Sequence, residues 1–283
     1  MAQGIRETRT AILSTLSRRI KTRLQGKRAV QVQAFADHFY ATLADEDIFH
    51  WRSDDLYGST LYAWEFLQEY ASGQPKIRVF NPDVEQHGWQ SVHTIVQVLS
   101  DDLPFTMDSL RVELSRRHLG IHGVHNSVLS LKRDESNLFS GFLSNTSRSK
   151  SVHHETLITL EIDRHTGAEL LNDLQTDLDD VLYQVGIVVN DFESMENSLD
   201  DLLQMYDQIQ PEKRPVGLGE TREFVSWLKL HFTFLGYDEY KLTRKGGKKL
   251  EVVLGSQQGL LKYCDDYCRA ELVDDSLREK AQF

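Results

Sequence analysis

The sequence predicts an α+β protein, because stretches with the apolar spacing of helices are followed by stretches that alternate apolar and polar residues as strands do. Residues 1–72 show only the helical spacing. Beyond Pro75 the order becomes strand, helix, strand, strand and helix, followed by more helix and a terminal hairpin. With a later strand available to complete the sheet, this order is the split arrangement of ferredoxin-like folds.

The first 75 residues are predicted to form a helical region with helices at about 5–24, 29–43 and 56–70. It ends at Ser72-Gly73-Gln74-Pro75, because glycine and proline interrupt helices. Residues 1–30 contain eight basic side chains against one acidic side chain, Glu7. An arginine-rich amphipathic helix of this kind resembles a mitochondrial transit helix, but a bundle helix with a solvated basic face is the simpler interpretation.

The sheet is predicted from strands at 77–80, 93–99, 121–133 and 152–163, with a helix from Pro104 to His118. Residues 137–151 are rich in serine, asparagine and glycine and are predicted to be a loose connection.

After Gly167 apolar residues recur at helical steps as far as Phe192, and a further helix is predicted from Ser194 to Tyr206. Residues 165–210 contain eleven acidic side chains and no lysine or arginine, so they could meet the basic N-terminal helix within an oligomer. We predict two domains, 1–75 and 76–283. The second includes a long helical extension at 167–210 and a C-terminal helix plus hairpin at 220–262. Within the latter we expect a helix at 220–230, a strand at 232–242, a turn at 244–248 and a partner strand at 250–254.

Composition indicates a soluble protein. The formal net charge of −11 over 283 residues argues against nucleic acid as a partner. No apolar run approaches the roughly 20 residues that span a bilayer, and no secretory segment follows Met1. The only cysteines, Cys264 and Cys268, fit a reducing cytoplasm, and no second pair of ligands lies at zinc-finger spacing.

The most informative stretch runs from Val92 to Ser109. An apolar strand ends at Asp101-Asp102, and Pro104 stands where a helix would begin, since a missing N–H costs little there. We expect one of the two aspartates to cap this helix. A strand-to-helix turn with free helix N–H groups commonly holds a small polar ligand.

The remaining candidate sites are weaker. Histidines on neighbouring strands could bind a metal, but His122 and His125 differ by three positions and would face opposite sides of a regular strand. Ser109 lacks a nucleophile elbow, and Gly217-Leu218-Gly219 is not followed by the third glycine of a dinucleotide-binding turn. We therefore predict no metal site, no catalytic residue and no cofactor site in this segment.

The strand–turn–helix segment resembles the ligand-binding turn of ACT domains, although Phe105 replaces the glycine that often follows the proline. A closer resemblance comes from four ordered strings. Residues 100–110 look like the "NDDMPFLVDSV" pattern of the large bacterial NAD-specific glutamate dehydrogenases. Similar likenesses occur at 118–121, at 156–163 and at 223–237, the last resembling "FLRWL…HFTFLGYREY".

This resemblance implies the N-terminal regulatory region of a longer enzyme that oxidises L-glutamate with NAD. The nicotinamide and glutamate sites would then lie downstream, on a catalytic domain that acts as the partner of this segment in the same chain. It further implies an allosteric amino-acid effector, bound between two such modules of a homo-oligomer. A purely structural oligomerisation module, or an amino-acid sensor of another enzyme, are the alternatives.

In the predicted site, the ammonium group of the effector meets Asp101 or Asp102, and its carboxylate accepts backbone N–H groups at Phe105 to Met107. Such binding would bias the distant catalytic domain by about 1–3 kcal/mol. The residues of the predicted site are Asp101, Asp102, Pro104, Phe105, Thr106, Met107 and Asp108.

Overall fold

The computed structural model describes residues 9–43, 48, 52–143, 153–213, 216–243 and 249–263. The chain divides into two compact units, Met1–Tyr183 and Gln184–Phe283. We refer to them as unit 1 and unit 2 and describe each by itself.

Unit 1 begins with helices, as predicted: α1 (Arg9–Arg23), α2 (Gly26–Phe39) and α4 (Ser53–Leu67). On α1, the apolar residues Ile12, Leu16 and Ile20 recur every four positions and are all buried. Basic side chains of α1 and α2 pair with acidic side chains of α4, including Arg28 with Glu65 at 3.0 Å. This packing is that of a bundle helix with a solvated basic face.

The described part of unit 1 contains a sheet of five antiparallel strands in the order β1-β2-β5-β3-β4. The order β2, α6, β3, β5, α7 along the chain confirms the predicted ACT-like α+β fold. The strand that completes the sheet beside β2 is β1, which precedes β2 in the sequence, whereas we expected a later strand there. The elements are β1 (Lys76–Phe80), α5 (Val84–His87), β2 (Thr94–Asp101), α6 (Thr106–Arg116), β3 (Ile121–Arg133), β4 (Phe139–Phe142), β5 (His153–Ile162) and α7 (Ala168–Gln208).

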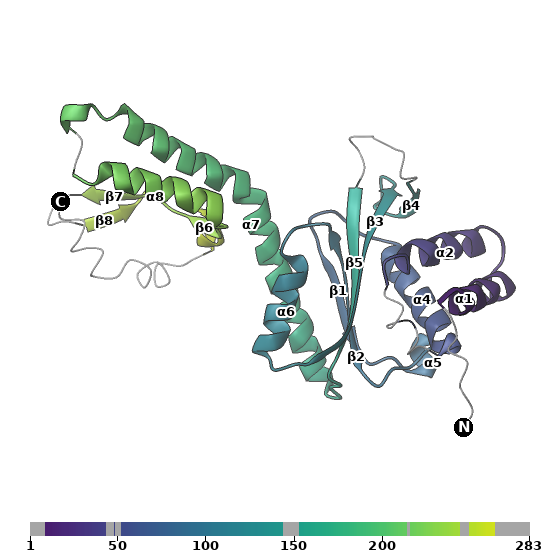
Figure 1. The fold of residues 1–283 in the computed structure, drawn as a ribbon. Helices are drawn as coiled ribbons and strands as arrows, with labels where there is room; N and C mark the ends of the chain where they lie inside the picture. The colour runs from purple at the N-terminus through teal and green to yellow at the C-terminus, as the bar shows by residue number, and fades with distance from the viewer. Residues whose placement is uncertain are drawn as a thin grey trace, which may run out of the picture. The chain divides into compact units, whose positions relative to one another are not determined.

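Helices cover both faces of this sheet. In Figure 1, α6 and the beginning of α7 lie on one side of the strands, and α1, α2 and α4 lie on the other. Each side has its own apolar core, formed by buried residues of the sheet and of the helices that cover it. Because β2 is covered on both faces, its residues from Thr94 to Ser100 are all buried, which explains its nearly continuous apolar run.

Several predicted boundaries were wrong. The helix expected from Pro104 begins at Thr106. The loose connection at 137–151 contains strand β4, which its serine and glycine content concealed. The two helices expected at 168–206 are the single helix α7, since no proline interrupts the stretch.

In its described residues, unit 2 contains the second part of α7, helix α8 (Leu218–His231) and four short strands. The strand expected at 232–242 is two shorter ones, β6 (Gly236–Tyr237) and β7 (Tyr240–Thr243). The predicted hairpin is confirmed by the antiparallel pairing of β7 with β8 (Lys249–Val252), while its turn at 244–248 lies outside the described residues, as do Cys264 and Cys268. The remaining elements are β9 (Gln258–Gly259), which pairs with β6, and the short 3-10 helices η1 (Pro211–Lys213) and η2 (Leu260–Lys262).

Three acidic side chains of α7 in unit 2, those of Asp191, Asp200 and Asp207, pair with basic side chains of that unit. Asp200 pairs with Lys229 at 2.5 Å, and Asp207 accepts both guanidinium hydrogen bonds of Arg222, at 2.6 and 2.9 Å. These pairs hold α8 against α7. Among the described residues, no helix is long and apolar enough to cross a bilayer.

Candidate functional site

The predicted site is the turn between β2 and α6 in unit 1, and the structure ties Asp101 firmly into the fold. One oxygen of its carboxylate, Oδ2, accepts hydrogen bonds from Ser72 Oγ at 2.9 Å and from the backbone N–H of Gly73 at 2.7 Å. The backbone N–H of Asp101 donates to the hydroxyl of Tyr70 at 2.8 Å. Asp101 therefore anchors the end of β2 to the loop that follows α4.

Asp102 is exposed and is held from β5. Its backbone N–H donates to the carbonyl of His154 at 3.0 Å, and its Oδ1 accepts a hydrogen bond from Thr156 Oγ1 at 2.9 Å. The expectation that one of the two aspartates caps the helix was wrong. The residue at the N-cap of α6 is Phe105, and no side chain caps it, because the aspartates stand three and four residues further back and bond elsewhere.

The start of α6 has backbone N–H groups that the helix itself does not satisfy. Phe105 has φ of 68°, in the left-handed region, and its side chain is 45% exposed. The first bond of the helix runs from Ser109 N to Phe105 O, so the N–H groups of Thr106, Met107 and Asp108 have no acceptor within the helix.

The side chains of the turn differ in exposure. Pro104 and Asp108 are exposed, whereas Thr106 is buried and donates from its hydroxyl to the carbonyl of Leu103 at 3.0 Å. Met107 is half-buried and packs against the core between the sheet and α6 and α7. Of the two adjacent aspartates before α6, Asp102 is therefore the exposed one, and Asp108 in the first turn of the helix is exposed as well.

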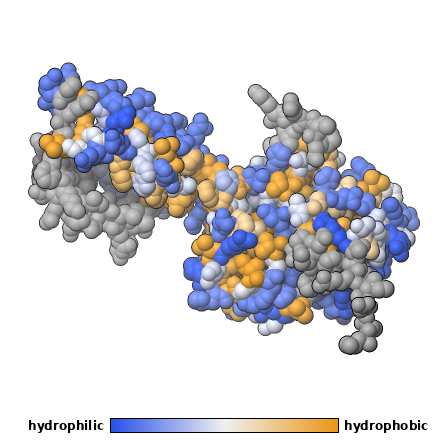
Figure 2. Space-filling model, viewed as in Figure 1, coloured by the Kyte–Doolittle hydropathy of each residue, from blue (hydrophilic) through white to orange (hydrophobic). Residues whose placement is uncertain are grey.

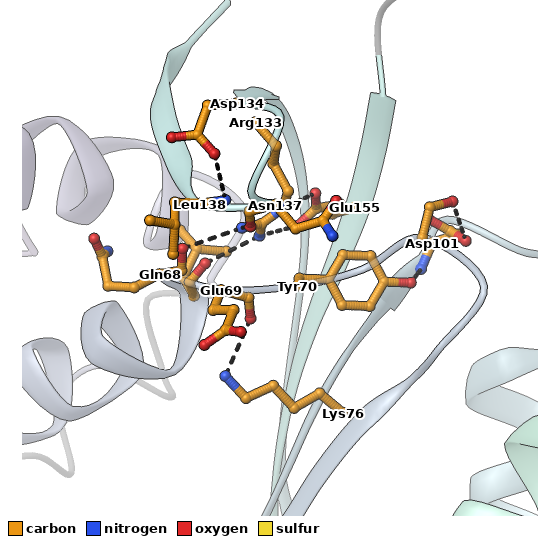
Figure 3. A network of polar contacts seen from close by, with 12 residues as sticks. Gln68, Glu69, Tyr70, Lys76, Asp101, Arg133, Asp134, Asn137, Leu138 and Glu155 are labelled. Atoms are coloured by element: carbon orange, nitrogen blue, oxygen red, sulfur yellow. Dashed lines mark hydrogen bonds and ion pairs between the residues drawn. The ribbon is translucent and has the colours of Figure 1, made fainter.

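Behind the turn lies a polar network that the sequence did not reveal (Figure 3). Arg133 on β3 pairs with Glu155 on β5 through two hydrogen bonds of 2.6 Å, and the two side chains are only 9% and 2% exposed. Arg133 also donates to the carbonyls of Leu67 and Asn137 at 3.0 Å, so it satisfies the end of α4.

Tyr70 connects this network to the predicted turn (Figure 3). Its ring lies 5.4 Å from the guanidinium carbon of Arg133, and its hydroxyl accepts from Asp101. Burial, together with the neighbouring Asp101 carboxylate, raises the pKa of the Tyr70 hydroxyl. In the sequence, Glu155 stands among the polar residues of an alternating strand, and it is buried because helices cover that face as well.

A second feature of unit 1 is a cavity of about 670 Å³ between the ends of α2 and α4 and the adjacent sheet face. Its lining includes His93, His122 and His125. The expectation that His122 and His125 face opposite sides was wrong, because a β-bulge between Ile121 and Gly123 shifts the register of β3.

The cavity histidines have partners other than a metal. His125 Nε2 lies 2.6 Å from the carbonyl oxygen of Phe39, and burial lowers the pKa of His125 to about 4, so that its imidazole is neutral at pH 7. His122 bonds Asp163 at 2.7 Å and stacks on His93 at 4.3 Å. Within the described part of the chain, no group of three or more potential ligands could hold a metal ion.

Comparison with known proteins places this geometry in a family. Residues 35–178, about half of the chain, match the family model described as "Glutamate dehydrogenase, ACT1 domain". The chain belongs to this family. The matched range of the ACT1 domain runs from α2 to the first part of α7 and includes the whole sheet, the predicted turn and the cavity.

Two curated relatives are both named NAD-specific glutamate dehydrogenase. The protein from Halomonas elongata is 39% identical over 259 residues, which are 90% of this chain and 16% of that protein. The protein from Pseudomonas aeruginosa is 40% identical over 220 residues, which are 77% of this chain and 14% of that protein. The chain thus spans about one sixth of the length of these relatives.

Proposed function

We propose that this chain is the N-terminal regulatory segment of an NAD-specific glutamate dehydrogenase, which in full length oxidatively deaminates L-glutamate to 2-oxoglutarate and ammonia. The observation that carries this proposal is the ACT1 match, together with two relatives of that name at 39% and 40% identity. In this proposal the segment is non-catalytic, NAD binds to a catalytic domain elsewhere in the same longer protein, and the enzyme works in the cytoplasm. The boundary at residue 75 between the two domains expected from the sequence also stays a prediction.

The regulatory ligand in this proposal is an amino acid at the turn between β2 and α6. Its carboxylate is held by the N–H groups that begin α6, where the helix dipole favours negative charge. Its ammonium group is held by Asp102, which is exposed, rather than by Asp101, whose Oδ2 already accepts two hydrogen bonds.

A thermal-shift titration with the common amino acids tests this site. We expect a saturable increase in Tm for one amino acid, and we expect Asp102→Asn to abolish it. Asparagine keeps an Oδ1 that can accept the hydrogen bond from Thr156, so the variant removes the charge while the local fold is retained. The matched control is Glu135→Gln, which removes an exposed carboxylate outside the turn and should leave the shift unchanged. A shift that survives in Asp102→Asn would exclude this site.

The alternative is a module that builds a homo-oligomer and binds no ligand. Hydrophobic residues gather at the surface over α6 (Figure 2), where Phe105 and Val112 are 45% and 68% exposed. An exposed apolar surface of this kind is compatible with contact to a second copy or to the downstream catalytic domain. Light scattering that gives a defined oligomer, combined with no response to any amino acid, would favour this alternative. If the full-length gene encodes a catalytic domain of another type of enzyme, the alternative of an amino-acid sensor attached to that enzyme is favoured.

A further inference from the structure

The cavity of unit 1 has a polar floor, which lies beside a stripe of leucines on the same sheet face. Gln97 on β2, Thr159 on β5 and His125 on β3 stand directly opposite one another in the register of the three strands. Elsewhere, the core under α1, α2 and α4 receives leucines from the same strands. Buried polar groups cost free energy unless each finds a hydrogen-bonding partner. The partners of these three side chains therefore have to be identified.

Two of these side chains have hydrogen-bonding capacity that the fold does not use. The amide of Gln97 is engaged, since its Oε1 accepts from Arg78 Nε at 2.8 Å and its Nε2 donates to Thr159 Oγ1 at 3.2 Å. The Thr159 hydroxyl accepts that bond and retains its hydrogen for donation. Among the described residues, it has no acceptor.

His125 presents the complementary group. Its Nε2 must carry the hydrogen, because it bonds the Phe39 carbonyl at 2.6 Å. In the neutral imidazole the other nitrogen, Nδ1, is then an acceptor. No residue in the described part of the chain donates to it. The floor thus offers a donor on Thr159 beside an acceptor on His125, on side chains opposite each other in the sheet.

Aromatic rings stand beside this pair, while other parts of the cavity lining carry the charged residues Arg52, Asp55 and Glu161. The rings of Phe39 and Tyr40 lie 4.0 and 5.6 Å from the His125 ring, and His93 and His122 form a second stack on the cavity wall. The volume of about 670 Å³ lies within the range typical of small-molecule sites.

We propose that this cavity binds a nucleobase, carried by a free nucleoside or a nucleotide. A nucleobase edge places an N–H donor next to an acceptor, which complements Nδ1 of His125 and the hydroxyl of Thr159. Its planar ring suits the aromatic wall. This second ligand site is separate from the turn between β2 and α6, and it does not depend on the proposed amino-acid effector.

Isothermal titration calorimetry of the chain with adenosine tests this proposal, and N6,N6-dimethyladenosine is the matched ligand control because its exocyclic nitrogen has no hydrogen to donate. We expect saturable binding of adenosine and binding of the dimethyl compound about tenfold weaker or less. AMP in a parallel titration shows whether a phosphate adds affinity. Glutamine, whose carboxamide presents the same donor and acceptor, shows whether the aromatic wall selects a ring. Binding of glutamine but not of adenosine would overturn the nucleobase assignment.

Two substitutions of Thr159 distinguish the loss of a ligand-binding group from a general disturbance of the fold. Thr159→Val removes the hydroxyl at almost constant volume and should weaken adenosine binding about tenfold, whereas Thr159→Ser should retain it. His125→Phe removes the acceptor and should abolish binding. Ser127→Ala, two residues from His125 on the same strand and outside the cavity lining, is the control that should bind normally.

Circular dichroism of each variant establishes that it is folded. The Asp102→Asn variant should bind adenosine as the unmodified chain does, so failure of the amino-acid site and failure of this site are distinguishable. Absence of saturable binding at millimolar adenosine, or equal binding by Thr159→Val and Thr159→Ser, would overturn the proposal.

Discussion

The two faces of the sheet in unit 1 are both covered by helices, yet they are built from different side chains. The face under α6 and α7 receives mostly apolar residues from the central strands, such as Val96, Val98, Ile158 and Leu160, and its buried polar residues Thr94, Ser100 and Thr156 lie near the strand ends. The opposite face, under α1, α2 and α4, has a leucine stripe flanked by polar groups: the Arg133–Glu155 pair on one side, and Gln97, Thr159 and His125 at the cavity on the other.

This difference separates the side of the domain that packs mainly through apolar contacts from the side that contains the polar cavity. Apolar contacts are nondirectional and tolerate small shifts, whereas buried polar groups fix the position of each helix and leave a chemically specific cavity. The predicted turn joins the two, because Asp101 and Tyr70 link it to the polar face and α6 belongs to the apolar face. The five predictions below test this contrast.

The largest effect is expected from Arg133→Met. It leaves the Glu155 carboxylate buried without its cation, which costs about 3–5 kcal/mol in free energy of unfolding. Urea denaturation measures the loss. The double variant Arg133→Met/Glu155→Leu should recover most of it, since no unpaired charge is then buried. A double variant no more stable than the single one would contradict this account of the polar face.

On the apolar face, Leu160→Ala should cost about 3 kcal/mol. Leu160 is fully buried, and its truncation loses transfer free energy and leaves a cavity. The same urea experiment applies, with Val128→Ala as a control. Val128 is 50% exposed, so its truncation should change stability by less than about 0.5 kcal/mol. Equal losses would mean that this face is not the closely packed one.

The polar face should also make stability depend on pH through His125. Burial lowers its pKa from 6.5 to about 4, so the unfolded chain binds a proton more readily than the folded one between these values. Stability is fully present above about pH 6.5 and is lost as the pH falls towards 4. We expect a loss on the order of 2 kcal/mol relative to His125→Gln, measured by urea titrations at pH 7 and pH 4.5. Parallel pH profiles for the two proteins would contradict it.

A smaller effect is expected where α4 meets the turn beside the cavity. A Cβ at Gly58 would lie 2.7 Å from the Cβ of Trp89 and even closer to the carbonyl oxygen of Gly88. Gly58→Ala should therefore cost about 1–2 kcal/mol through overpacking. Gly186→Ala, in the open on α7, is the matched control and should be neutral or stabilising. Thermal unfolding compares the two variants.

The smallest effect concerns the turn itself. Phe105 adopts φ of 68°, which only glycine occupies without strain, and the sequence resemblance had pointed to this position as one where glycine often stands. Phe105→Gly should therefore be more stable than Phe105→Ala by about 1 kcal/mol, because both lose the ring but only glycine relieves the strain. Equal thermal stabilities would argue against a strained turn.

Much of the fold could be predicted from periodicity, because the apolar spacing of a helix or strand records which of its sides is buried. The three N-terminal helices, the central strands β2, β3 and β5, and the hairpin of unit 2 were all predicted. Strand β4 was missed, since its residues lie in a stretch whose serine and glycine content is typical of a loop. The predicted turn was located correctly, but the roles of its two aspartates were not, because their partners lie 28 to 54 residues away.

The sequence by itself determined the α+β class, the element order and the family, since these depend on local periodicity and on strings of neighbouring residues. Only the tertiary structure decided which strand completes the sheet, which face carries polar groups, and that His122 and His125 share a cavity. The physical reason is that burial, register and hydrogen-bond partners depend on residues distant in the chain. Glu155 and Thr159 have the alternation of solvent-facing residues, and only the helices packed over them make them buried.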